Sequence, residues 1–96
     1  MSRLTTDRIT ADTLVYTGNC VLYGIWMETD GTNVATLSVY DNTSAAGKMV
    51  RKVVVPGADY FGGFDAPAGI LCANGIYADI AGTGAAAWVS YSPTLI

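Results

Sequence analysis

The residues able to do chemistry are few in this chain, and their spacing matches no catalytic arrangement. The sequence contains no histidine, so Ser–His and Cys–His nucleophile pairs are excluded. Its two cysteines, Cys20 and Cys72, each lie inside an apolar run, which favours buried free thiols over a zinc site. A disulfide between them requires that their strands be neighbours. We expect two unpaired thiols.

The carboxylates show no pattern that would bind a metal or cleave a substrate. Loops at one end of a β-sandwich can gather aspartates around calcium, but no DxDxDG-type spacing provides the six to eight oxygens that calcium takes. Glu28 is the only glutamate and lies in no recognisable glycosidase setting. The glycine-rich motifs Gly62-Gly63 and Gly82-Thr83-Gly84 lack the strand–loop–helix context of a phosphate loop. We therefore expect no enzyme activity, no metal and no cofactor. The aspartates near predicted turns are Asp30, Asp41, Asp59, Asp65 and Asp79.

Composition limits the classes of partner. Charged residues make up 14% of the chain and hydrophobic ones 51%, whereas soluble domains average about 25% charged. The net charge of −3, with one small basic cluster at Lys48, Arg51 and Lys52, argues against nucleic acid. No stretch approaches the ~20 apolar residues of a membrane helix, and the polar start shows no export signal. We expect synthesis in a reducing cytoplasm and no membrane partner.

Short runs rich in Val, Ile, Tyr and Leu recur between Gly, Asn, Asp and Pro, which is typical of antiparallel strands. Seven or eight such runs, spaced about 8–12 residues apart, predict an all-β fold. The architecture expected is an antiparallel β-sandwich or a jelly-roll-like barrel. Residues 1–12 are expected to form an N-terminal arm or edge strand, and residues 13–96 a single β domain. The clearest predicted strands cover residues 13–17, 19–29, 33–41, 48–55, 70–73, 76–81 and 86–91.

The strongest of these runs, residues 19–29, is apolar on both alternating faces, which predicts a central strand whose outer face lies against another subunit. Its two faces are Cys20, Leu22, Gly24, Trp26 and Val21, Tyr23, Ile25, Met27.

Turn signals predict how these strands are connected. Asp30-Gly31 predicts a type I′ hairpin that pairs residues 19–29 with residues 33–41. Residues 59–69 are expected to be irregular, and Asn74-Gly75 marks a second tight turn.

Aromatic side chains offer two interpretations. Tyr60, Phe61 and Phe64, around Gly62-Gly63, could form an exposed loop for a partner's groove, although closing one end of the core is favoured. Trp26 and Trp88 are predicted in strands, which favours core or subunit interface over a sugar-stacking platform.

Two long segments resemble small virion structural proteins of tailed bacteriophages: VYTGNCVLYGIWMETDGTNVATLSVYDNTSAAGKMV and FGGFDAPAGILCANGIYADIAGTGAAAWVSY. The resemblance extends from about Thr13 to Tyr91 and rests on packing and turn motifs. It implies a capsid decoration, or cement, protein. Such proteins commonly sit as trimers on the outer surface of the head and clamp neighbouring major capsid subunits.

The resemblance therefore implies a homotrimer on the virion surface, with the major capsid protein as partner. Low charge and apolar strands fit permanent burial between copies. Residues 2–12 could add a strand-donating contact. Alternatives are a tail or head–tail junction component, or a carbohydrate- or receptor-binding module of a phage tail. The candidate interface residues are Arg3, Leu4, Ile9, Trp26, Tyr60, Phe61 and Phe64.

Overall fold

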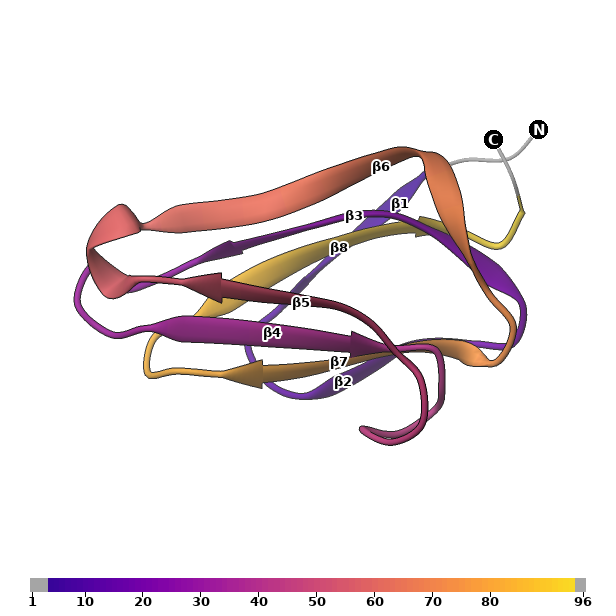
Figure 1. Cartoon of the computed structure of the whole chain (residues 1–96), viewed down its shortest axis with the longest axis horizontal. Helices are drawn as coiled ribbons and strands as arrows, with labels where there is room; N and C mark the ends of the chain where they lie inside the picture. Colours follow the sequence, from indigo (N-terminus) through magenta and orange to yellow (C-terminus); the bar gives the residue numbers. More distant parts are fainter. Residues whose placement is uncertain (1–3, 95–96) are drawn as a thin grey trace.

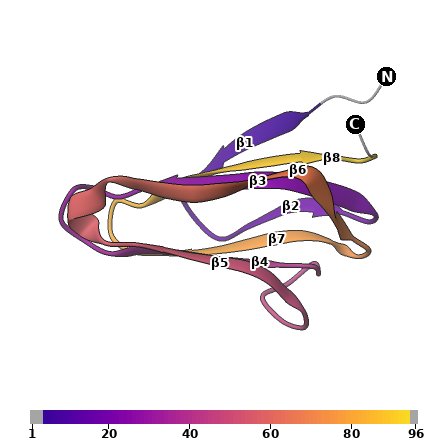
Figure 2. The same ribbon diagram turned by 45° about the horizontal axis from the view of Figure 1, so that its top comes forward.

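A computed structural model describes residues 4–94 and shows two four-stranded antiparallel sheets with one short 3₁₀ helix (Figure 1). The two sheets lie face to face as layers (Figure 2). Among the described residues, no helix is long and apolar enough to cross a bilayer. The elements are β1 (Thr5–Ile9), β2 (Thr13–Thr17), β3 (Cys20–Glu28), β4 (Ala35–Tyr40), β5 (Met49–Val55), η1 (Gly57–Asp59), β6 (Phe61–Cys72), β7 (Gly75–Ala81) and β8 (Ala86–Ser92).

The strand pairing is that of one long hairpin rolled up on itself. β1 pairs with β8, β2 with β7, β3 with β6, and β4 with β5, so that the β4–β5 turn is the tip of the hairpin. Rolling brings β8 against β3 and β7 against β4. The resulting sheet orders, β1-β8-β3-β6 and β2-β7-β4-β5, define a jelly roll. The predicted all-β sandwich of seven or eight strands is confirmed.

The core lies between the two layers and is built from alternating residues. In β4 the predicted alternation is confirmed, because Ala35, Leu37 and Val39 are fully buried while the residues between them are half-buried. Burying a side chain of the size of Leu or Val contributes about 1.5–3 kcal/mol to folding. The largest fully buried side chains are Leu22, Ile25, Met27, Leu37, Ile76, Val39, Val55 and Val89.

The predicted faces of β3 are wrong beyond its middle, because a bulge reverses the alternation. Pairing with β6 and β8 shifts register between Leu22 and Gly24. Leu22 faces the core before the bulge, and Ile25 and Met27 face it afterwards. An irregularity of this kind inserts residues into one strand and turns the following side chains to the opposite face. Trp26 is therefore directed outward.

The hairpin predicted at Asp30-Gly31 is also wrong, since the connection carries the chain from one sheet to the other. The Asp30 carboxylate accepts hydrogen bonds from the backbone N–H groups of Thr32 and Asn33, at 2.9 and 2.8 Å. The carboxylate thus organises a wider loop than a two-residue turn. Asn74-Gly75 likewise links strands of different sheets. Among the described strands, β4 and β5 alone are both consecutive and paired.

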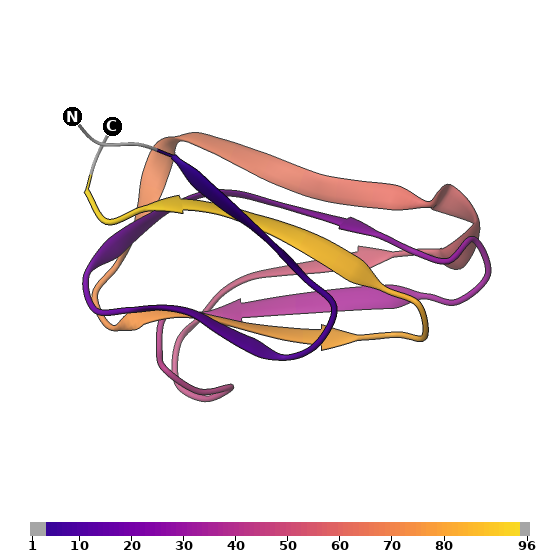
Figure 3. The ribbon, with the colours of Figure 1, turned by 180° about the vertical axis from the view of Figure 1, so that it is seen from behind.

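Residues 59–69 were expected to be irregular, yet most of them belong to β6, at one edge of the first sheet. Gly63 allows this, because a Cβ there would lie only 2.7 Å from Trp26 Cα. Residues 66–69 face the single residue Tyr23 across the register shift and so accommodate Pro67. At the opposite edge, β1 runs along the outside of β8 (Figure 3).

Candidate interaction surfaces

The structure separates the predicted interface residues between surface and core. Arg3 lies outside the described residues. Ile9 is 5% exposed and belongs to the core, so its side chain is not available to a partner. Leu4 is exposed and borders a shallow depression that Tyr23, Asp65 and Pro67 also line. The remaining predicted residues are aromatic and lie near the β5–β6 end of the sandwich.

The aromatic cluster around Gly62-Gly63 divides between the two predicted roles. Phe64 points inward and packs against the core, where the Arg51 guanidinium lies 5.2 Å from its ring centroid. Tyr60 and Phe61 are exposed instead, at 54% and 63%. Tyr60 also has a positive φ of 65°, and its ring lies over Gly31. One aromatic thus closes the core and two remain at the surface.

A tryptophan face occupies the outer side of the first sheet, and it comprises Trp26, Trp88, Arg8, Glu28 and Asp65. Trp26 is opposite Trp88 on one side and Gly63 on the other. A Cβ at Gly63 would lie 2.8 Å from Trp26 Cδ2, so the indole lies across β6 over this glycine. The indole Nε1 donates a hydrogen bond to Asp65 Oδ1 at 3.1 Å, which fixes the ring.

Charged groups border this ring pair. The Arg8 guanidinium lies 5.5 Å from the Trp88 ring centroid and 3.4 Å from Glu28 Oε1. Trp26 is 44% exposed, whereas Trp88 is half-buried beneath Arg8. Neither tryptophan belongs to the buried core cluster, so the subunit-interface alternative stays a prediction for both.

An apolar stripe crosses the outer side of the second sheet, and it comprises Leu14, Tyr77, Tyr40 and Met49. Register places Leu14 opposite Tyr77, Tyr77 opposite Tyr40, and Tyr40 opposite Met49. The stripe therefore spans all four strands. Leu14 and Met49 are each 44% exposed at its two ends. Sequence reasoning missed this row because it emerges only from the pairing of strands far apart in the chain.

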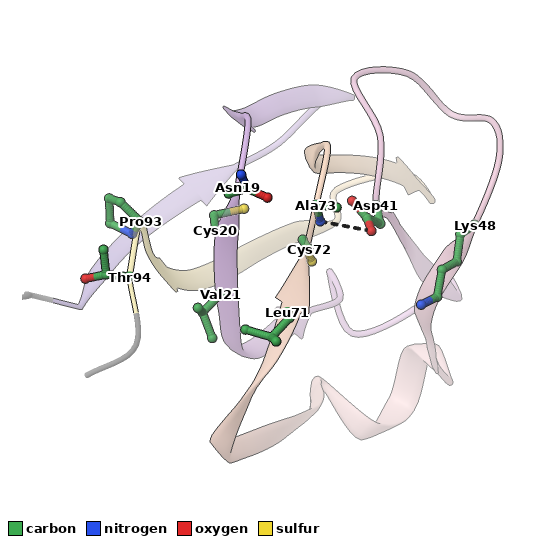
Figure 4. Close-up of a pocket in the computed structure, with 10 residues that line it drawn as sticks. All are labelled: Asn19, Cys20, Val21, Asp41, Lys48, Leu71, Cys72, Ala73, Pro93 and Thr94. Carbon is green, nitrogen blue, oxygen red and sulfur yellow. Dashed lines mark hydrogen bonds between the residues drawn. The ribbon is translucent and has the colours of Figure 1, made fainter.

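The two cysteines face each other across β3 and β6, where Cys20 pairs with Cys72 in register. Both are buried and free, and they border an open depression of about 460 Å³. Burial raises the pKa of Cys20, and burial with the neighbouring Cys20 and Asp41 raises the pKa of Cys72 to about 12. These thiols are therefore protonated and poorly nucleophilic at neutral pH. The residues bordering the depression are labelled in Figure 4.

Asp41, beside this depression, has a structural role. Its two carboxylate oxygens accept hydrogen bonds from the backbone N–H groups of Ala73, at 3.1 Å, and Asn74, at 2.8 Å (Figure 4 draws the first). These bonds satisfy donors of the turn between β6 and β7. Asp41 thus ties the end of β4 to the connection between β6 and β7, as expected of a turn-forming aspartate.

Two other carboxylates have shifted pKa values. Hydrogen bonds from the backbone N–H groups of Asn33 and Thr32 lower the pKa of Asp30. Burial and the adjacent Asp12 raise the pKa of Asp79. Within residues 4–94, no group of three or more Cys, Asp or Glu side chains is arranged to hold a metal ion.

Comparisons with protein-family models, curated proteins and solved structures found no match to this chain.

Proposed function

We propose that this protein is a non-enzymatic virion structural protein that decorates the outer surface of a tailed-phage head and stabilises contacts of the major capsid protein. The sequence resemblance supports this role. The single structural observation that carries it is the apolar stripe of Leu14, Tyr77, Tyr40 and Met49.

The stripe has the properties of a surface that another protein covers. It is continuous across the second sheet and ends in two exposed aliphatic side chains, Leu14 and Met49. Covering apolar area stabilises an assembly by about 25 cal/mol per Å² before association costs. Scattered apolar residues on a surface need no explanation, whereas a contiguous row marks an interaction site. Charged residues are absent from the row itself.

Self-association through this stripe fits a trimer. Obligate contacts between copies are more hydrophobic than transient ones. A trimer would then present three equivalent surfaces to the capsid shell. When all three surfaces bind at once, the overall affinity for the shell rises although the contact made by each copy stays the same. Stable decoration therefore does not require a large contact from each copy.

Localisation in intact particles tests the proposal. Cryo-electron microscopy of particles from the encoding virus is expected to show the jelly roll as density on the outer head surface, above junctions of capsid subunits. Density in the tail or at the head–tail junction would favour that alternative and refute head decoration. Absence from purified particles by mass spectrometry would refute a virion role altogether.

A binding experiment connects this role to the stripe. Heads that lack the protein are mixed with the wild type or with the double variant Leu14→Ser/Met49→Ser. The variant is expected to bind less tightly because its copies no longer assemble. Val54→Ser is the matched control, since Val54 is 55% exposed on the same outer face but outside the stripe. Equal binding by all three proteins would separate the stripe from the function.

A further inference from the structure

We infer that the tryptophan face of the first sheet is a binding site for a neutral pyranose oligosaccharide, a property beyond capsid decoration. The inference starts from the Trp26 indole, which is held in a fixed orientation across β6. The indole lies over Gly63 and donates a hydrogen bond to Asp65. Rotation of the ring would break this hydrogen bond or the contact with Gly63. At 44% exposure, the indole nevertheless presents much of its surface to solvent.

A fixed, exposed indole suits the ring of a sugar. The axial C–H groups of a pyranose form a flat apolar patch, and a large aromatic ring binds such a patch at low entropic cost because it is already ordered. Two glycines let the indole and its carboxylate partner lie close to the sheet. A Cβ at Gly24 would lie 3.1 Å from Asp65 Oδ1, and Gly63 lies beneath the indole.

Polar groups at the border of the ring match hydroxyl groups. Asp65 and Glu28 offer carboxylate acceptors, and Arg8 offers guanidinium donors. A few polar groups placed around an apolar surface fix the orientation of a small ligand. Such mixed donors and acceptors complement sugar hydroxyls, which both donate and accept.

Charge at this border selects among ligands. Two carboxylates accompany one guanidinium, so the face carries a small negative charge that disfavours phosphates, nucleic acids and acidic sugars. A neutral sugar suffers no such repulsion. The same charged groups make this face less suited than the apolar stripe to burial against a second copy.

The length of the face favours an oligosaccharide over a single sugar. Phe61 pairs with Glu28, is 63% exposed, and shares the outer face of β6 with Gly63. It therefore provides a second aromatic surface beyond Trp26. A chain of at least two pyranose units could contact both rings.

An array of immobilised neutral, amino-sugar and acidic oligosaccharides, probed with the full chain, tests the inference. At least one neutral oligosaccharide is expected to bind saturably, and the soluble form of that sugar is then titrated by calorimetry. Trp26→Ala should weaken binding about tenfold or more, with Trp26→Phe intermediate. Leu71→Ser is the matched control, because Leu71 is exposed on β6, the strand of Gly63 and Asp65, but does not belong to the tryptophan face.

Several results would overturn the inference. These are no saturable binding to any neutral oligosaccharide, a preference for acidic sugars, or unchanged affinity in both Trp26 variants. Loss of self-association in Trp26→Ala without sugar binding by the wild type would assign the face to a second copy. Asp65→Asn keeps the shape of the border and so gives a readout even if Trp26→Ala fails to fold. Its affinity is expected to fall severalfold, and an unchanged affinity would exclude the polar border from the site.

Discussion

Replacing Gly63 with alanine tests the strand pairing that exposes Trp26. A Cβ at this position would lie 2.7 Å from Trp26 Cα, whereas ordinary contact begins at 3.4 Å. The neighbouring backbones must therefore separate by at least 0.7 Å. Hydrogen bonds of about 2.9 Å stretched by this amount fall outside the normal range.

The magnitude follows from this separation. Overpacking costs about 1–3 kcal/mol, and losing one or two ladder hydrogen bonds adds about 1 kcal/mol each. We expect Gly63→Ala to lower the free energy of unfolding by about 2–4 kcal/mol, measured by urea denaturation followed by circular dichroism. The indole of Trp26 should also move, which tryptophan fluorescence would report.

Gly18→Ala is the matched control for Gly63→Ala. Gly18 has a positive φ of 99°, but a Cβ there would meet nothing within 4 Å. Its replacement should cost about 1 kcal/mol from backbone strain alone. If Gly63→Ala were no more destabilising than Gly18→Ala, the close approach of β3 and β6 at this point would be wrong.

Two further predictions concern titratable groups. Because the pKa of Cys72 is raised from 9.0 to about 12, its native thiol should react with iodoacetamide at pH 8 about a thousandfold more slowly than in urea; equal rates would contradict its burial. The raised pKa of Asp79 contributes stability that is fully present below its ordinary pKa of 3.8 and is lost as pH rises through the raised pKa. Asp79→Asn should therefore be more stable than the wild type at pH 7 and similar to it at pH 3. The gain at pH 7 should be less than about 1 kcal/mol, because Asp79 is only partly buried and solvent screens its charge. A deficit in stability at pH 7 would show that burial and the neighbouring Asp12 do not disfavour the charged form of Asp79.

The fold class could be predicted because the residue composition of individual strands identifies them as strands. The alternation of Ala35, Leu37 and Val39 directly indicated a core-facing strand, and Pro56 marked the end of β5. The connections were not predictable in the same way. In this jelly roll, Asp30-Gly31 links two layers, and only the long-range partners of β3 and β4 reveal that.

The candidate surfaces depended on information that no local pattern holds. Because of the β3 bulge, Trp26 faces outward and Met27 faces inward. The bulge lies at Tyr23, opposite residues 66–69, which are more than forty positions away in the chain. The apolar stripe joins Leu14 and Met49 only through the register of four strands. Exposure of Phe61 but not Phe64 follows from the unexpected extension of β6.

Sedimentation equilibrium of the purified chain is the most direct test that the apolar stripe is covered by sister molecules. A stable species at three times the 10.0 kDa mass of one chain is expected at micromolar concentration. Leu14→Ser/Met49→Ser should shift it to the single-chain mass, while Val54→Ser should not. A wild-type protein that sediments as one chain at every concentration would contradict the account.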